Sequence, residues 1–530
     1  MSDPKKHPVW KKEFVQYKRT TMLRPIPLRM KIKASDEQDA VAKADFSRGL
    51  HIVNAYAGTG KTSTLQLISE ENQNKKILYL TFNRSMAEQS RERFGMNCKC
   101  STIHALAYSS LSAALKKKVD FVRANDLYLY TDGVYEANHV KKTIDNFCYS
   151  VDTEIGEKHV PSAASDPSSI LAKTKKVIEA MLDEKEPLKL AHDVYLKTWA
   201  TKRDKLDEPY DFLMLDEAQD TNPVTWDLIL RLHRNGLPVV LVGDMHQSIY
   251  AWRGASDAMR QASNEKHTRY NLTNSYRLTH QLARDTTLYL NRVLGDMVEL
   301  KGVASANKGC HRDTILSRSN AVLIRRAYEL VGKFHKRVHW VGTAEKNQWK
   351  PDSIYNFDEI YDVLDLYMRK RVKSSSAVSA YRSWEELAVA MDGDETSDQE
   401  MRFAYELVSE FGRGVTDLIK TINRNSVDPA SADVFLTTAH KSKGLEWDNV
   451  TMMDDFLSLK KEYQKMDGAR LREERNLKYV AMTRAKCRLE PSRDLLEWLN
   501  VQRKVSPDAK VLTVDAGSGG RKRRGRTFST

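Results

Sequence analysis

The segment Ala55–Thr62, which reads AYAGTGKT, constrains the fold of this chain more than any other segment. The apolar run His51–Val53 precedes it, and the helical pattern Lys61–Ser69 follows it. A glycine-rich turn between a strand and a helix leaves backbone N–H groups to surround a phosphate. The strict form of this motif begins with glycine, and this chain has Ala55 in that place. The pattern nevertheless predicts a nucleotide-binding α/β fold.

Other apolar segments lead into a polar turn or a helix in the same way. In the first half of the chain these are Ile77–Phe82 before Ser85–Phe94, Phe212–Leu215 before DEAQD, and Val239–Val242 before GDMHQS. Short apolar strands that alternate with helices indicate a parallel sheet, and the polar turns at the strand ends are where such sheets bind ligands. A second set predicts a second α/β lobe. It comprises the strands Ala321–Arg325, Val434–Thr437 and Val450–Met453 and the helix Leu471–Thr483.

Two long segments interrupt these patterns, and we interpret both as insertions into the lobes. Residues 111–204 are largely helical and basic, with a loop at Ser162–Ser169. Residues 351–432 are helical too, with an acidic break at Asp392–Asp398. The C-terminal GSGGRKRRGR is of low complexity, and we expect it to be disordered. A nucleic-acid tail, a nuclear signal and a solvated tail without a specific role all remain open for it.

The chain carries 85 Lys and Arg against 71 Asp and Glu, a formal charge of +14. This balance favours a polyanionic partner, although a merely soluble basic protein would fit as well. No run approaches the ~18 apolar residues of a membrane span, and the N-terminus has no apolar signal-peptide core. Five cysteines, with Cys98 and Cys100 as a C-x-C pair, argue against a disulfide framework. We therefore expect reduced cysteines, no membrane partner and an intracellular location.

Asp216 and Glu217 open the motif DEAQD directly after an apolar strand. Beside a phosphate loop, Lys61 can place its charge at the β- and γ-phosphates, and Thr62 can offer its hydroxyl to Mg²⁺. Asp216 is then placed to hold the Mg²⁺ shell, and Glu217 is the candidate general base for the attacking water. An acidic helix N-terminus is the structural alternative for DEAQD. The order of the two motifs favours hydrolysis of ATP with Mg²⁺.

Two arginines, Arg277 in SYR and Arg484 in YVAMTR, follow the first lobe in the sequence. Phosphoryl transfer places negative charge on the equatorial oxygens, and an arginine aimed at them is worth about 10³–10⁵ in rate. If both arginines reach the phosphate, the nucleotide lies between two lobes, and hydrolysis can change the cleft between them. A single arginine is more often a surface charge, so this assignment needs support from the other motifs.

The order of the motifs resembles that of superfamily 1 DNA helicases of the UvrD/Rep type. The motifs are ASDEQ at 34–38, AYAGTGKT, LTFNRSMAE, STIHALA, DEAQD, VGDMHQSIYAWRGA, NSYR, TTAHKSKGLEW and YVAMTRAK, and they span about Gln38 to Arg488. Within these helicases the chain looks most like the helicase part of the F-box DNA helicase family, through TIDNFCYS, HDVYLKTW, TAHKSKGLEWDNV and DDF. The resemblance implies an α/β fold of two RecA-like P-loop lobes, with parallel sheets flanked by helices and a helical insertion in each lobe.

The resemblance also implies a division of the chain into domains. We expect an N-terminal extension at 1–30, RecA-like lobe 1A at 31–110 and 205–275, helical insertion 1B at 111–204, RecA-like lobe 2A at 276–350 and 433–515, a reduced 2B-like helical insertion at 351–432, and a basic disordered tail at 516–530.

The same resemblance assigns roles at the nucleotide. Gln38 corresponds to the glutamine that reads the adenine edge, Tyr276 to the aromatic that stacks on the base, and Gln247 to the residue that senses the γ-phosphate. Glu446 stands where the family contacts the ribose, and the two arginines named above match those that contact the γ-phosphate. The rest of the predicted ATP-binding set is Ala57, Gly58, Thr59, Gly60, Lys61, Thr62 and Ser63.

A motor on single-stranded DNA needs stacking surfaces as well as positive charge, and stacking is worth about 1–3 kcal/mol per base. Phe82 and Trp252 lie just after strands in motifs that resemble DNA-facing ones, and core packing is the alternative for both. The rest of the expected DNA-binding set is Asn83, Thr102, His104, Tyr250, His440 and Lys443. Ordinary helix packing remains open for His104.

The chain departs from the family pattern at three places. The first motif begins at residue 34, which leaves too little of this chain for a preceding F-box, so ubiquitin-ligase function is not carried over. The stretch between NSYR and KSKGLEW is shorter than is usual in UvrD and Rep, so we expect a reduced second insertion. After TRAK, the sequence CRLEPS replaces an apolar strand, and Glu490-Pro491 breaks the strand pattern.

These observations predict an ATP-dependent DNA helicase that moves along single-stranded DNA, 3′→5′ by resemblance, in DNA repair, recombination or replication. Its expected partners are ATP, single-stranded DNA and single-strand/duplex junctions, and we expect a monomer in the cytoplasm, nucleoid or nucleus. Two alternatives stay open. One is an ATP-driven translocase that strips proteins from DNA with little unwinding, and the other is a P-loop module in which nucleotide gates a partner. The hydrolysis residues argue against the module.

Overall fold

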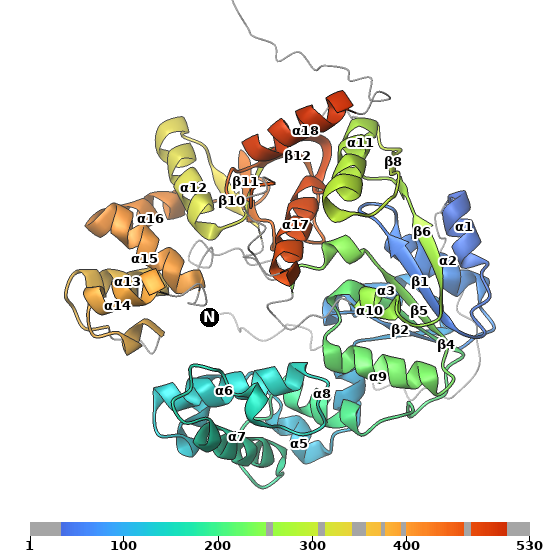
Figure 1. The fold of residues 1–530 in the computed structure, drawn as a ribbon, viewed down its shortest axis with the longest axis horizontal. Helices are drawn as coiled ribbons and strands as arrows, with labels where there is room; N and C mark the ends of the chain where they lie inside the picture. The colour runs from blue at the N-terminus through green and yellow to red at the C-terminus, as the bar shows by residue number, and fades with distance from the viewer. Residues whose placement is uncertain are drawn as a thin grey trace, which may run out of the picture.

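The computed structural model describes residues 33–250, 258–305, 313–341, 357–372, 377–393, 399–459 and 468–505. It contains two parallel sheets flanked by helices and two further groups of helices (Figure 1). In Figure 1 the first sheet lies at the right and the second at the upper centre, with the helical groups at the bottom and the left. The predicted fold class, two RecA-like lobes with helical insertions, is confirmed.

The first sheet has six parallel strands in the order β3-β2-β4-β5-β1-β6. The strands are β1 Leu50–Ala55, β2 Ile77–Leu80, β3 Cys98–Ser101, β4 Phe212–Asp216, β5 Val239–Gly243 and β6 His267–Leu272. β1, β2, β4 and β5 are buried along their whole length, because helices cover both faces of the sheet. The register pairs Asn54 with Gly243 and Asp216 with Val242, which brings the turns after β1, β4 and β5 together.

Helices lie on both faces of the first sheet. They are α1 Asp36–Ala42, α2 Lys61–Glu71, α3 Arg84–Arg93, α4 Ile103–Ser109, α9 Pro223–Arg234 and α10 Ala258–Ala262. Successive strand residues point to opposite faces. Val53 therefore lies in one core with Leu65 of α2. Its neighbour Ile52 lies in the opposite core with Trp226 of α9.

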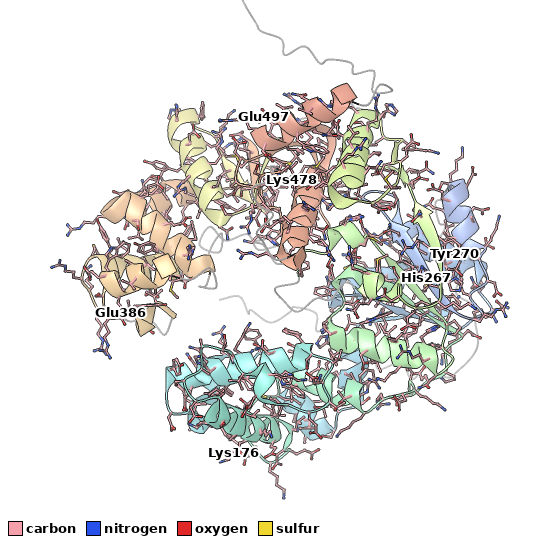
Figure 2. The ribbon with its side chains drawn as sticks, in the orientation of Figure 1. Lys176, His267, Tyr270, Glu386, Lys478 and Glu497 are labelled. Atoms are coloured by element: carbon pink, nitrogen blue, oxygen red, sulfur yellow. The ribbon has the colours of Figure 1, made fainter. Side chains whose placement is uncertain are left out.

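The second sheet has five parallel strands in the order β10-β11-β9-β12-β13. The strands are β9 Asp313–Ser317, β10 Val338–Trp340, β11 Val434–Thr438, β12 Trp447–Met452 and β13 Ala485–Glu490. Its helices are α11 His280–Tyr289, continued by the π-helical turn Leu290–Leu294, α12 Asn320–Phe334, α17 Gly468–Met482 and α18 Arg493–Val505. A short parallel pair, β7 Asn274–Ser275 and β8 Lys301–Gly302, precedes this sheet in the chain. Lys478 of α17 (Figure 2) is buried in this lobe, and its ammonium donates to Asp494 Oδ2 at 3.0 Å.

Each group of inserted helices shares a core with the lobe that it adjoins. The first group comprises α5 Ala113–Lys118, α6 Val134–Tyr149, α7 Pro167–Leu182 and α8 His192–Thr201, with the 3-10 turns Ala124–Tyr130 and Glu157–His159. The second comprises α13 Asp358–Tyr367, α14 Trp384–Gly393, α15 Gln399–Phe411 and α16 Val415–Arg424, with the 3-10 turns Ala377–Ala380 and Gly412–Gly414. Val224 of α9 belongs to the core of the first group, and Ile315 of β9 to that of the second. Among the described residues, no helix is both long and apolar enough to cross a membrane.

The predicted strand Ala321–Arg325 is wrong, because these residues lie within α12. The strand of this region is β9, which ends at Ser317. Ser319 caps α12, and its hydroxyl accepts a hydrogen bond from the N–H of Val322. A short apolar run does not distinguish a strand from a buried turn of helix, and here the cap decides between them.

The segment with Glu490-Pro491 forms a strand after all. β13 ends at Glu490, and Pro491 follows it. β13 is also the edge strand of its sheet and pairs with β12 on one side. A proline just beyond the end of an edge strand removes no hydrogen bond from the ladder, so the strand tolerates it.

The cysteines follow the prediction only in part. Cys98, Cys100 and Cys148 are free thiols and are buried. Cys487 in β13 is disulfide-bonded, so the expectation of reduced cysteines throughout is wrong. The number and spacing of cysteines carry no information about which distant segments meet in space, and that proximity decides which thiols can pair.

Candidate functional site

The phosphate loop occupies the turn between β1 and α2. Gly58 and Gly60 adopt left-handed backbone angles, with φ of 74° and 81°, which side chains other than glycine rarely allow. A Cβ atom at Gly58 would lie 2.4 Å from the Cβ of Arg277. A Cβ atom at Gly60 would lie 2.8 Å from Nε2 of Gln38. Both glycines are therefore required by the backbone and by the close packing around the loop.

Gln38 and Tyr276 lie together on one side of this loop. Ser35 and Gln38 form a capping box at the start of α1, which fixes the position of the glutamine. The amide of Gln38 donates to Thr64 Oγ1 at 3.2 Å and accepts from the hydroxyl of Tyr276 at 3.3 Å. The ring of Tyr276 is 47% exposed, so it offers a face on which a base can stack.

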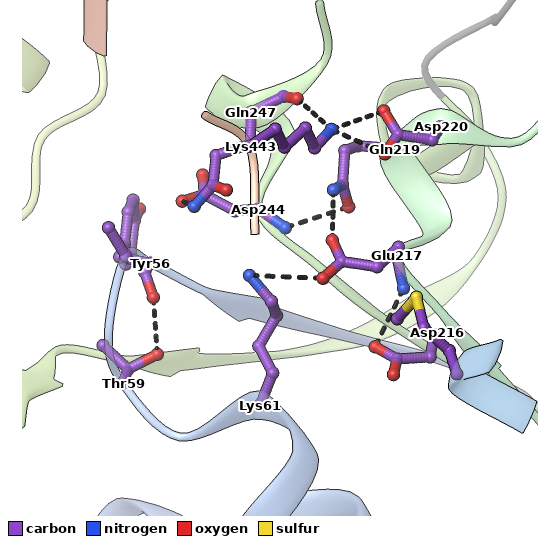
Figure 3. A network of polar contacts seen from close by, with 12 residues as sticks. Tyr56, Thr59, Lys61, Asp216, Glu217, Gln219, Asp220, Asp244, Gln247 and Lys443 are labelled. Atoms are coloured by element: carbon purple, nitrogen blue, oxygen red, sulfur yellow. Dashed lines mark hydrogen bonds and ion pairs between the residues drawn. The ribbon is translucent and has the colours of Figure 1, made fainter. Parts of the chain in front are cut away.

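Asp216 ends β4 and Glu217 follows it, opposite the phosphate loop (Figure 3). The carboxylate of Asp216 accepts from the hydroxyl of Tyr79 at 2.7 Å and from the N–H of Glu217 at 2.9 Å. Glu217 has a φ of 51°, an uncommon left-handed conformation for a residue with a side chain. Its Oε1 lies 3.9 Å from Nζ of Lys61, so the two predicted hydrolysis residues are brought together.

Gln219, Asp244 and Tyr479 were missed by sequence reasoning and connect the site residues. The amide of Gln219 donates to Glu217 Oε2 at 2.5 Å and accepts from the N–H of Asp244 at 3.2 Å. Asp244 Oδ2 then accepts from the Gln247 amide at 2.8 Å and from the Tyr479 hydroxyl at 2.9 Å. Each of these residues belongs to a motif already recognised in the sequence. A polar side chain that is expected to be buried inside such a motif is the signal that could have identified them.

The charges in this site shift the pKa values of its carboxyl groups. Burial, together with the charge of Glu217, raises the pKa of Asp216 to about 6. Burial would also raise the pKa of Glu217, but the charges of Lys61 and Lys443 outweigh it and hold that pKa below its ordinary value. Glu217 is therefore ionised at neutral pH, as a general base must be.

Arg277 lies against the phosphate loop at Gly58, and Arg484 lies near Arg277 in the second lobe. Arg277 donates through Nε to Glu446 Oε2 at 2.7 Å and through Nη1 to the carbonyl of Thr483 at 3.2 Å. Arg484 is 1% exposed and donates to the carbonyls of Val480 and Leu445 at 2.8 and 3.0 Å. Burial and the nearby charge of Arg277 lower the pKa of Arg484 to about 9. The two guanidinium groups thus lie near each other at the seam between the lobes.

Comparisons with known proteins agree with this geometry. Residues 37–253 match the model of an AAA domain, and residues 433–489 match that of a UvrD-like helicase C-terminal domain. Over 514 residues the chain is 29% identical to F-box DNA helicase 1 of Gallus gallus, covering 86% of this chain and 48% of the relative. It is 29% identical over 510 residues to F-box DNA helicase protein 1 of Schizosaccharomyces pombe, covering 86% of this chain and 57% of the relative. ATP-dependent DNA helicase Rep of Escherichia coli is 28% identical over 252 residues, 41% of this chain and 37% of the relative.

The chain thus carries an AAA domain and a UvrD-like helicase C-terminal domain, and it resembles the UvrD/Rep-like helicases. It spans about half the length of the F-box helicase relatives that it matches. The UvrD-like C-terminal match covers β11, β12, α17 and most of β13, the elements that flank Glu446 and Arg484.

A metal site fits the oxygen donors of this UvrD/Rep-like chain. Asp216 supplies a carboxylate at the end of β4, and Thr62 supplies a hydroxyl in the first turn of α2. Mg²⁺ commonly takes one or two protein oxygens and completes its shell with water and phosphate oxygens. Among the described residues, no group of three or more His, Cys, Asp or Glu is placed to hold a metal ion.

Several of the predicted DNA-binding residues line one cavity of about 160 Å³. Its wall includes Phe82, His104 and Tyr250, together with Tyr149 and Asp193 from the inserted helices. Phe82 is 56% exposed, which does not fit simple core packing. The imidazole of His104 lies 3.3 Å from Asp193, so this histidine also connects the lobe to its insertion. Trp252 lies outside the described residues.

Asn83 and Thr102 have a local structural role in addition to any contact with DNA. The side chain of Asn83 accepts from the N–H of Met86 and caps α3, and that of Thr102 accepts from the N–H of Ala105 and caps α4. Such caps typically stabilise a helix by ~1 kcal/mol. Both residues lie at helix N-termini after strands of the first sheet, where backbone N–H groups favour phosphates.

His440 and Lys443 differ in how far they are exposed to solvent. The carbonyl of His440 accepts from the hydroxyl of Tyr250 at 3.4 Å, and its side chain is half-buried. The ammonium of Lys443 binds both carboxylate oxygens of Asp220, at 2.7 and 2.5 Å, and its side chain is 10% exposed. The structure thus places Lys443 in a buried ion pair instead of on an open surface.

Proposed function

We propose that this protein is an ATP-dependent DNA helicase that translocates 3′→5′ on single-stranded DNA. The observation that carries the proposal is the seam at the phosphate loop. There the N–H of Tyr276 donates to the carbonyl of Gly58 at 2.8 Å, and the N–H of Ala57 donates to the hydroxyl of Tyr479 at 3.2 Å. A nucleotide bound by this loop contacts both lobes, so cleavage of its γ-phosphate changes how the lobes fit together.

At the nucleotide, the first lobe supplies the groups for hydrolysis. Lys61 neutralises the β- and γ-phosphates, and Glu217 accepts the proton of the attacking water. Bound Mg²⁺, held by Asp216 and Thr62, would neutralise phosphate charge. Gln247 lies within the hydrogen-bond network of Asp244 and senses the γ-phosphate from there.

The second lobe supplies the groups that respond to the phosphate. Arg277 and Arg484 stabilise the charge that develops in the transition state. Glu446 orients Arg277 in the structure and contacts the ribose when the nucleotide is bound. Gln38 and Tyr276 hold the adenine through the amide and the aromatic ring. This division of roles explains why hydrolysis requires both lobes.

We infer that the DNA strand crosses the two lobes along the surface that carries Phe82 and Tyr250. Both aromatics line the cavity described above, which also touches Asp216 and Glu217. Bases that stack there contact the same wall that carries the hydrolysis carboxylates. Lobe closure therefore alters the grip on DNA, and repeated cycles move the protein along the strand.

The proposed domains are those expected from the sequence: the N-terminal extension, lobes 1A and 2A, helical insertion 1B, the reduced 2B-like insertion and the basic tail. The proposed pathway is DNA repair, recombination or replication, with ATP and single-strand/duplex junctions as partners and a monomer as the active unit. The support for a DNA substrate is the similarity to proteins named as DNA helicases, together with the charge of +14.

The decisive experiment measures ATP turnover with and without single-stranded DNA and then unwinding of duplexes with a 3′ or a 5′ tail. We expect DNA to stimulate turnover and only the 3′-tailed duplex to be unwound. Unwinding of the 5′-tailed duplex alone would overturn the polarity. Stimulated turnover without unwinding, but with displacement of a protein bound to the strand, would identify a translocase instead. Turnover that DNA does not change would contradict the proposal.

A further inference from the structure

Lys443 lies on the turn that follows β11, and its side chain crosses from the second lobe into the first (Figure 3). The turn is closed by the N–H of Ser442, which donates to the carbonyl of Thr438 at 2.9 Å. Gly444 follows with a φ of 83°, a conformation that favours glycine. This tight turn gives the lysine a defined direction.

Two short turns of the first lobe receive the ammonium of Lys443. One is the 3-10 turn Ala218–Asp220, where both carboxylate oxygens of Asp220 accept from it at 2.7 and 2.5 Å. The other is the 3-10 turn Met245–Gln247, where the backbone carbonyl of Gln247 accepts from it. A single cation therefore holds two separate turns together.

These two turns carry predicted hydrolysis residues. Glu217 immediately precedes the first turn, and its carbonyl accepts from the N–H of Asp220 at 2.9 Å. Gln247 ends the second turn. The side chains of Lys443 and Asp220 are 10% and 5% exposed, and the ammonium lies 5.0 Å from the centre of the Tyr250 ring. A lysine with these partners can reach a DNA phosphate only by giving them up.

We propose that Lys443 is a positioning residue for hydrolysis: from the second lobe it clamps together the turns that carry Glu217 and Gln247, so the hydrolysis site is complete only when the lobes are closed. The inference rests on the proposed function, and it replaces the expected DNA-phosphate contact of Lys443 with an inter-lobe one.

The physical basis is the burial of the ion pair. Two charges that leave water lose much of their hydration, and each depends on the other for compensation. When the lobes separate, Asp220 and Lys443 lose this mutual compensation, and the two turns are no longer held to a common donor. Since a misplacement of about 1 Å at a reacting centre can lower a rate by about 10²-fold, loosening the turns is sufficient to stop turnover.

The test compares Lys443→Met, Asp220→Asn and the double variant, with Lys441→Met as a control on the same turn. Lys441 is exposed, whereas Lys443 is largely buried. The measurements are kcat and KM for ATP with saturating oligothymidylate, and the affinity for that oligonucleotide over a series of salt concentrations. Each single variant should lower kcat about 10–100-fold with a change in KM below about threefold. DNA affinity and its salt dependence should stay at wild-type values.

Coupling between the two positions supplies a second criterion. Because both single variants break the same ion pair, the double variant should lose no more kcat than either one alone. Losses that multiply in the double variant would overturn the proposal. It would also be overturned if Lys443→Met kept its kcat while DNA affinity fell and the salt dependence decreased by about one phosphate contact. Lys441→Met should keep the wild-type kcat.

The wild-type protein in the same assay distinguishes failure of the proposed function from failure of the proposed role of Lys443. If it hydrolyses no ATP, the proposed function fails and this inference fails with it. If it hydrolyses ATP and Lys443→Met keeps its kcat, only the inference fails. If Lys443→Met does not fold, the double variant takes its place, because it leaves no unpaired charge at either position. A lowered kcat in the double variant then supports the proposed role of Lys443, and a wild-type kcat overturns it.

Discussion

Each lobe has a parallel sheet flanked by helices, but the two differ at the turn that follows the first strand of the sheet in the sequence. After β1 the chain turns through glycines into α2, whereas after β9 it turns through Arg318 and Ser319 into α12. At the second turn the carboxylate of Asp455 accepts from the N–H of Arg318 at 3.0 Å and from the N–H of Ser319 at 2.8 Å. The hydroxyl of Ser319 also donates to it, at 2.9 Å. The place where a phosphate could bind is thus filled by the protein's own carboxylate.

This difference shows how one scaffold supports two roles. A helix N-terminus attracts an anion through its N–H groups and dipole. In the first lobe the anion is to be supplied by a nucleotide, and in the second it is supplied by Asp455. The second lobe instead contributes cations near the site of the first lobe through Arg277, Lys443 and Arg484.

The largest effect should come from Lys61→Ala, which removes the lysine cation at the phosphate loop of the first lobe. We expect kcat for ATP to fall by more than about 10³-fold, while single-stranded DNA still binds. Asn320, the first residue of α12, occupies the equivalent place in the second lobe, so Asn320→Ala is the matched control. Turnover and filter binding would be measured for both. A comparable loss in Asn320→Ala would show that the lobes do not differ as described.

Glu217→Gln should lower kcat by about 10²–10³-fold and leave ATP binding intact, because an amide accepts no proton from water. Bound nucleotide would be separated and identified after single-turnover mixing, and we expect intact ATP to remain on the protein. Recovery of ADP at the wild-type rate would show that Glu217 is not the general base. Another residue would then have to activate the attacking water.

Lys443→Met should weaken folding in a pH-dependent way. Burial already raises the pKa of Asp220 to about 6, with the charge of Glu217 also raising it and those of Lys443 and Lys61 lowering it. Without Lys443 this pKa rises further, so the folded state binds a proton more tightly than the unfolded chain, and stability falls as pH rises through that value. We expect a loss of about 3 kcal/mol at pH 8 and about 1 kcal/mol at pH 5, measured by denaturant unfolding. A loss that is equal at both pH values would contradict the buried pair.

Asp455→Ala should have the smallest effect and tests the filled site directly. Removing the carboxylate leaves the N–H groups of Arg318 and Ser319 without their acceptor, which should lower the free energy of unfolding by about 1–2 kcal/mol. Thermal unfolding in the presence of phosphate would then show partial recovery, which the wild type should not show. Unchanged stability in the variant would mean that the Asp455 carboxylate does not stabilise the turn before α12.

The centre of the fold was predictable because its strands are short, apolar and fully buried. β1, β4 and β5 correspond closely to the predicted strands. β3 and β6 were missed, since both lie at the edges of the first sheet and carry exposed or polar residues that disguise a strand. The predicted loop Ser162–Ser169 is likewise shortened, because Pro167 begins α7 with Asp166 as its cap.

The site residues that lie within the first lobe could also be predicted from the sequence. Lys61 and Glu217 come from motifs whose spacing and order limit where their side chains can lie, and the structure brings them within 3.9 Å. The contacts between the lobes were not predictable in the same way. The pairing of Lys443 with Asp220 joins residues 223 positions apart, and it depends on how two complete lobes pack. The role of either residue in the site stays a prediction until variants are measured.

The hydroxyl of Tyr479 accepts from the N–H of Ala57 at 3.2 Å and donates to Asp244 at 2.9 Å. Burial raises the pKa of this phenol well above its ordinary value, so it stays neutral wherever the protein is folded. Counter-ions weaken attractions between separated charges but leave a neutral hydroxyl bridge nearly untouched. Raising the salt concentration should therefore weaken the proposed contacts with DNA phosphates before it weakens this contact between the phosphate loop and α17.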